Sequence, residues 1–135
     1  MNVLDTNVLL YRKDPRDPRK QSIADSLIRS LQNGVLLWQV ACEYVAASRK
    51  LAPYGYSQTE AWDDIEDLSL IWSCRLPSLD TFRHARALIG RFSLSFWDAL
   101  IVAACLDAGV MRLYSEDFSA YPRIDTLEVI NPFLP

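Results

Sequence analysis

Short apolar runs alternate with longer amphipathic stretches along the whole chain, and this alternation constrains the fold more than any other feature. Val35–Trp38 is typical of the runs, being too short for a helix and flanked by Gly34. Between the runs, stretches such as 19–33 repeat apolar side chains at helical spacing. Apolar strands joined by helices predict a parallel sheet that helices cover on both faces.

The sequence therefore predicts an α/β protein, a three-layer α/β/α sandwich around a mostly parallel sheet of four to five strands. The expected strands are 2–4, 35–38, 70–72, 112–114 and 128–130. The expected helices are 7–12, 19–33, 39–50, a segment opening at the Ser57–Glu60 capping box, 80–90 and 95–108. The last of these is apolar nearly all round, so we expect it to be buried. No repeat or linker divides the 135 residues, so we expect one domain, 1–135.

Composition excludes several classes of protein. The chain contains no run of about 18 apolar residues, so a membrane-spanning helix is not expected. The N-terminus also lacks the pattern of a secretory signal. The three cysteines, Cys42, Cys74 and Cys105, lie in apolar stretches without Cys-x-x-Cys spacing. They predict buried free thiols in a reducing compartment, hence a cytoplasmic protein without a membrane partner. With a single histidine, a Cys/His zinc site is not expected.

Four acidic residues stand beside apolar segments, where carboxylates are uncommon because burying an unpaired charge costs free energy. They are Asp5, Glu43, Asp98 and Asp117. Asp5 ends the first predicted strand, and Asp117 follows the fourth. In a parallel sheet with helices on both faces, ligands bind at the carboxyl ends of the strands. If the four acids converge at that edge, the cluster needs a cation, and all-oxygen ligands favour Mg²⁺ or Mn²⁺.

Each acid also has a purely structural explanation. Asp5 is placed to cap the helix that follows it, and Ser95-x-x-Asp98 is close to a capping box. Glu43 is compatible with an ordinary helix position, and Asp117 with a turn after a strand. No single position decides between these alternatives. The shared location of all four acids at one edge of the sheet favours a site.

These residues resemble the PIN-domain ribonucleases, and the length and order resemble the VapC-type toxins of toxin–antitoxin pairs. Four motifs carry the resemblance, which spans about residues 2–130: Asp5-Thr6-Asn7, Glu43 in a helix, Phe96-Trp97-Asp98-Ala99, and Ser115-Glu116-Asp117-Phe118. The family often has Thr where this chain has Ser115, but the hydroxyl is retained. Because Glu116 adjoins Asp117, the sequence leaves open which of the two faces a metal.

The resemblance implies a metal-dependent endoribonuclease of the PIN-like fold. Asp5, Glu43, Asp98 and Asp117 would bind Mg²⁺ (or Mn²⁺) and act as the catalytic acids. Thr6, Asn7 and Ser115 would support these acids. The family also implies an RNA substrate, commonly tRNA or rRNA, a cognate antitoxin protein and a homodimer. The sequence does not decide whether the site binds one metal ion or two.

A basic stretch follows the first predicted strand and is a candidate for RNA contact, Arg12 and Lys13 above all. It contains Arg12, Lys13, Arg16, Arg19 and Lys20, against Asp14 and Asp17. A solvated loop is the simpler alternative. The chain is also rich in aromatic side chains, which belong either to the core or to a partner-binding face: Trp38, Tyr44, Tyr54, Tyr56, Trp62 and Trp72.

Two other functions compete with the nuclease. A receiver-like signalling domain also combines a parallel sheet with an acidic Mg²⁺ pocket. It needs an Asp after the third strand and a Lys after the last, and this chain offers neither. A non-catalytic binding module of the PIN-like fold is the stronger alternative, although the presence of all four acids argues against it.

Overall fold

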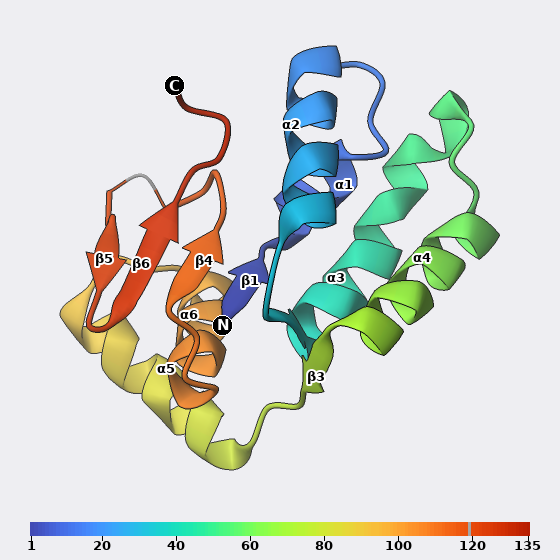
Figure 1. The fold of residues 1–135 in the computed structure, drawn as a ribbon. Coiled ribbons are helices and arrows are strands. Elements are labelled where there is room, and N and C mark those ends of the chain that lie inside the picture. Colours follow the sequence, from blue (N-terminus) through green and yellow to red (C-terminus); the bar gives the residue numbers. More distant parts are fainter. Residues whose placement is uncertain (119) are drawn as a thin grey trace.

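The computed structural model describes residues 1–118 and 120–135, and its centre is a mostly parallel sheet (Figure 1). The strands lie in the order β3-β2-β1-β4-β6-β5. Their bounds are β1 (Asn2–Leu4), β2 (Gly34–Leu37), β3 (Ser73–Arg75), β4 (Arg112–Tyr114), β5 (Arg123–Ile124) and β6 (Leu127–Ile130). All neighbouring strands are parallel except β5 and β6. The predicted α/β class and mostly parallel sheet are confirmed.

Helices connect the strands and form the outer layers. They are α1 (Thr6–Tyr11), α2 (Pro18–Ser30), α3 (Trp38–Ala47), the 3₁₀ helix η1 (Ser48–Tyr54), α4 (Gln58–Ile71), α5 (Leu79–Arg91) and α6 (Phe96–Asp107). α5 and α6 pack together as a pair, whereas α3 contacts α1 and α4 (Figure 1). The apolar α6 buries Ala99, Ile101, Val102, Ala103 and Cys105, as its composition predicts.

The strand expected at 70–72 is wrong. Residues 70 and 71 form the last turn of α4, where Leu70 and Ile71 are mostly exposed. Trp72 ends that helix in an extended conformation, and β3 begins only at Ser73. The indole of Trp72 packs directly on Gly34, where an added Cβ would come within 2.6 Å of the ring. Glycine at the start of β2 therefore permits this contact.

The sheet also has six strands in the described part of the chain, one more than the upper expectation. The additional strand, β5, contains two residues and forms a tight hairpin with β6. Asp125 in its turn has a φ of 52°, a conformation that Asp tolerates. Two residues are too few for an alternation of apolar and polar side chains, so the sequence carries no strand signal there.

The expected burial of the three cysteines is correct only for Cys105. Cys42 and Cys74 are exposed. Cys42 lies on the face of α3 that lines a surface cavity, and Cys74 belongs to β3, an edge strand whose three residues are all exposed. Among the described residues, no single helix is long and apolar enough to cross a membrane; only α5 and α6 taken together are, as a pair bent by 118°.

Candidate metal-binding site

Asp5 stands at the centre of the candidate site, directly after the central strand β1. Its Oδ1 accepts a hydrogen bond from the backbone N–H of Thr6 at 2.7 Å, so Asp5 does cap α1. Its Oδ2 accepts from the hydroxyl of Ser115 at 2.8 Å. The carboxylate is only 4% exposed, yet no cation pairs with it among the described residues. A helix cap alone does not require such burial.

Glu43 reaches the same place from α3, which follows the neighbouring strand β2. Thr6 Oγ1 donates to Glu43 Oε2 at 3.0 Å, and Gln39 Nε2 donates to Glu43 Oε1 at 2.6 Å. Gln39 and Glu43 are four residues apart on the helix, which places them on one face. Both carboxylate oxygens are thus held by side chains from two elements, so the direction of the carboxylate is fixed.

The segment after β4 supplies the third acid. Ser115 Oγ accepts from the N–H of Asp117 at 3.1 Å and from Asn7 Nδ2 at 3.3 Å. Asn7 Nδ2 also donates to Asp117 Oδ2 at 2.9 Å. Glu116 points elsewhere, where it accepts from Tyr11 and pairs with Lys20. Of the two adjacent acids, the structure therefore directs Asp117 toward the site.

Asp98 lies in the first turn of α6. Ser95 caps this helix by accepting from the N–H of Asp98 at 3.1 Å. The reverse half of a capping box is not formed within the described residues, although the side chain of Ser95 also acts on the Asp98 carboxyl and lowers its pKa. The capping alternative thus explains Ser95, but it does not require the carboxylate of Asp98 to face the pocket.

All four acids line one pocket of about 570 Å³, together with Thr6, Asn7 and Lys50. Burial raises the pKa of Asp5 to about 6, against the effect of its hydrogen bonds with Ser115 and Thr6, and the charges of Glu43 and Asp117 raise it further. Burial also raises the pKa of Asp98, against the effect of its hydrogen bond with Ser95, and the charges of Asp117 and Glu43 add to the rise. Mutual repulsion of this kind is what a bound cation removes.

The chemistry of the pocket fits a divalent cation, although no ready-made ligand group exists. The donors are carboxylate, amide and hydroxyl oxygens, which suit Mg²⁺ or Mn²⁺. Asn7 Oδ1 is buried and accepts no hydrogen bond from any described residue, so an acceptor at the site remains unused. Among the described residues, however, no three Asp, Glu, His or Cys side chains are close enough together to hold a metal as they stand. Side-chain rotation would have to complete the coordination.

The basic stretch predicted to contact RNA does not line this pocket. Lys13 lies 3.6 Å from Asp64 and over the ring of Tyr56. The Nε of Arg12 is buried without a hydrogen-bond partner among the described residues. The other three cations of the stretch also make contacts within the chain: Arg16 with Asp14, Arg19 with the carbonyl of Phe133, and Lys20 with Glu116. RNA contact by Arg12 and Lys13 stays a prediction.

Sequence reasoning missed two residues of the site. Lys50, in η1, is the only Lys or Arg that lines the pocket among the described residues. No ion pair within the described chain occupies it. Gln39 was recognisable from its spacing of four residues to Glu43. Lys50 carried no such signal, because the turn from α3 into η1 decides its position.

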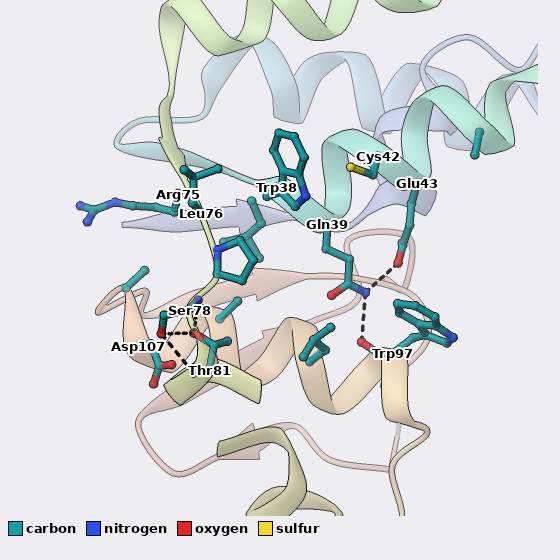
Figure 2. Close-up of a pocket in the computed structure, with 16 residues that line it drawn as sticks. Trp38, Gln39, Cys42, Glu43, Arg75, Leu76, Ser78, Thr81, Trp97 and Asp107 are labelled. Carbon is teal, nitrogen blue, oxygen red and sulfur yellow. Dashed lines mark hydrogen bonds between the residues drawn. The ribbon is translucent and has the colours of Figure 1, made fainter. Parts of the chain in front are cut away.

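A second cavity of about 580 Å³ adjoins the acidic pocket (Figure 2). Glu43, Ala46 and Trp97 line both. The rest of its wall is largely apolar and includes Trp38, Leu37, Leu76, Pro77, Leu100 and Ala104.

No protein-family model matches this chain, and no curated protein matches it. Solved structures do match. VapC20 of Mycobacterium tuberculosis, a sarcin–ricin loop cleaving toxin, is 19% identical with a TM-score of 0.69, covering 93% of this chain and 98% of that one.

Two toxin–antitoxin complexes are similar over the same extent. The complex from Klebsiella pneumoniae matches with 16% identity and a TM-score of 0.69, covering 98% of each chain. VapBC-1 from nontypeable Haemophilus influenzae matches with 17% identity and a TM-score of 0.67, covering 97% of each chain. At this level of identity the likeness establishes architecture. The chain thus has the PIN-like α/β/α fold of the VapC toxins, as the four motifs predict.

Proposed function

We propose that this protein is a metal-dependent endoribonuclease that hydrolyses phosphodiester bonds of RNA, and that it is the toxin of a toxin–antitoxin pair. One observation carries the proposal: carboxylates from four separate segments line one pocket, and no Lys, Arg or His within the described residues forms an ion pair with any of them. The fold shared with a sarcin–ricin loop cleaving toxin supports RNA as the substrate.

Mg²⁺ or Mn²⁺ would be held by Asp5, Glu43, Asp98 and Asp117. When bound, such a cation would offset the repulsion among the carboxylates and supply Lewis-acid activation of water and of the phosphodiester. With that chemistry, no histidine would be needed as a general base, and none lines the pocket among the described residues.

The remaining residues of the pocket orient these acids. Thr6 and Gln39 each donate to one oxygen of Glu43, and Ser115 donates to Asp5. Asn7 positions Asp117 through its amide N–H. Supporting contacts of this kind fix the direction of a ligand, and their loss typically weakens metal binding by about 10- to 100-fold.

The proposal includes partners and a location. Three of the six aromatic side chains singled out by the sequence are exposed, Trp38 by 55%, Tyr54 by 46% and Trp62 by 53%, whereas Tyr44, Tyr56 and Trp72 belong to the core. Exposed aromatic side chains are typical of protein interfaces. We assign Tyr54 and Trp62 to contacts with a cognate antitoxin and with a second copy of the chain, and we place the protein in the cytoplasm with its RNA. Several neighbours are complexes of toxin and antitoxin.

The decisive experiment is cleavage of a mixture of tRNA and rRNA by the purified protein with Mg²⁺, with Mn²⁺ and with EDTA, beside the Asp98→Asn variant. We expect metal-dependent cleavage that the variant loses by at least about 100-fold while its circular dichroism is unchanged. Asp80→Asn is the matched control, because Asp80 also lies in the first turn of a helix capped by serine but pairs with Arg83 on the surface.

A non-catalytic binding module is the second candidate, and the lack of a ready-made group of three metal-binding side chains among the described residues favours it. Calorimetric titration with Mn²⁺ separates the two functions. Absence of both metal binding and cleavage would establish the module and overturn the nuclease.

A further inference from the structure

The apolar cavity beside the acidic pocket has the features of a site for one uncharged, flat group. Trp38 and Trp97 are 55% and 61% exposed and line it, so both indoles are available for stacking. Three charged residues line its wall, and each is already paired, held or directed away. Asp107 pairs with His84 at 2.9 Å, Thr6 and Gln39 hold the two oxygens of Glu43, and the guanidinium of Arg75 points out of the cavity in Figure 2. Among the described residues, a phosphate therefore finds no cation inside.

Gln39 gives this cavity a hydrogen-bonding direction. Its Nε2 donates to Glu43 Oε1 at 2.6 Å and to the carbonyl oxygen of Trp97 at 3.2 Å (Figure 2). Both partners only accept, so the amide nitrogen must face them and the carbonyl oxygen must face the other way. That oxygen, Oε1, points toward the cavity (Figure 2), is shielded from water and accepts no hydrogen bond from any described residue.

An acceptor that neither water nor protein satisfies lowers stability unless a ligand supplies a donor. A ligand donor reaches this oxygen only when a neighbouring side chain moves, and rotamer changes of exposed side chains take picoseconds to nanoseconds. The cavity shares Glu43 and Trp97 with the acidic pocket. A group bound in it would therefore lie beside the bond that the acids would cleave.

We propose that this cavity binds one unpaired nucleobase of the RNA, next to the scissile phosphate, and prefers a base with an exocyclic amino group such as adenine or cytosine. The inference rests on the proposed nuclease function. Unpaired RNA bases are commonly splayed out, stacked on aromatic side chains and hydrogen-bonded at their edges. The base stacks on Trp38 and Trp97, and its amino group donates to Gln39 Oε1. Uracil has no amino group, and two carbonyl oxygens flank its one N–H at the pairing edge.

Binding of labelled pentanucleotides tests the contribution of a single functional group of the base. The protein carries Asp98→Asn, so that the RNA stays intact, and the probes are oligoadenylate, oligouridylate and a pentamer of purine riboside, which lacks only the amino group of adenosine. We expect fluorescence anisotropy to give about 3- to 10-fold tighter binding of oligoadenylate than of the other two. Adding Trp38→Ala should weaken binding of oligoadenylate by about 5- to 100-fold, and Trp38→Phe should restore most of it.

Trp62→Ala is the control, since Trp62 is 53% exposed but lines neither cavity. Equal binding of adenosine and purine-riboside oligomers would overturn the amino-group preference. Unchanged binding in Trp38→Ala would overturn the base site itself, and cleavage by the wild-type protein in the same preparation would then show that the nuclease proposal survives. If the wild-type protein neither cleaves nor binds RNA, both the nuclease proposal and the base-site proposal are overturned.

Discussion

Two carboxylates in the pocket and two outside it, Asp14 and Asp125, have opposite electrostatic surroundings. Asp125 accepts two hydrogen bonds from Arg91, and Asp14 is held by Arg16, so the guanidinium groups lower the pKa of both carboxyls. In the pocket, burial and like charges raise the pKa of Asp5 and Asp98 instead. The sharpest contrast is between neighbours: Glu116 pairs with Lys20, and Asp117 turns into the pocket.

This difference indicates that the carboxyls of Asp5 and Asp98 are held in the pocket at a cost in stability, even though Asp5 also caps α1. A carboxylate that serves the fold has a cation or enough solvent, whereas Asp5 has neither and is 4% exposed. Groups with perturbed pKa values in a cleft are candidates for function because the fold bears a cost for holding them there. The cation proposed above would be the simplest partner for these carboxylates.

The adjacent residues Glu116 and Asp117 allow a direct test of this difference between paired and unpaired acids. Asp117→Asn should lower metal-dependent RNA cleavage by at least about 100-fold, because it removes a charge from the pocket. Glu116→Gln should leave cleavage within about twofold, because Glu116 is neutralised by Lys20 outside the pocket. Initial rates on the same RNA measure both. Equal losses of cleavage rate in the two variants would contradict the assignment, because they would show that the direction of the side chain does not determine its contribution to cleavage.

The stability of the metal-free protein sharpens the comparison. Asp5 has a pKa of about 6 in the folded state against 3.8 as a free side chain, so the folded state binds more protons between these values. Stability from this group is therefore present at low pH and is lost as the pH rises from about 4 to 6. At pH above 7, Asp5→Asn should raise the free energy of unfolding by about 3 kcal/mol.

Urea unfolding in EDTA at pH about 7.5 and about 4 measures this effect, and the two proteins should converge at the lower pH. Asparagine keeps an acceptor for the N–H of Thr6, so the cap of α1 survives. Added Mn²⁺ should stabilise the wild type at the higher pH and leave the variant almost unaffected. A variant that is less stable at both pH values would mark Asp5 as a structural residue.

Lys50 gives the smallest expected effect. As the one cation lining the pocket among the described residues, it is placed to contact a phosphate of the RNA. Lys50→Ala should raise KM several-fold with little change in kcat, and should reduce the slope of log affinity against log salt by about 0.7. Lys50→Arg should behave as the wild type. Arg49→Ala, a change at the exposed neighbouring position outside the pocket, is the control; an equal slope change there would remove the special role of Lys50.

The sequence was sufficient for the fold class, since the apolar run at β2 and the wholly apolar α6 leave few alternatives to a covered parallel sheet. Asp5 and Glu43 could be placed at one edge because each follows a strand. The end of α4 could not be located, because Leu70 and Ile71 are apolar yet exposed and so imitate a strand. Which of Glu116 and Asp117 enters the pocket depends on Lys20, 96 residues away from Glu116, which no local pattern contains.

One hydroxyl has a consequence for the timing of activity during synthesis. Ser115 joins Asp5, Asn7 and Asp117, and Asn7 is separated from Asp117 by 110 positions in the chain. The pocket cannot close until β4 has left the ribosome and paired with β1. Nascent chains and fragments truncated before residue 115 therefore carry no complete site, so the proposed activity would begin only after β4 has emerged and joined the sheet.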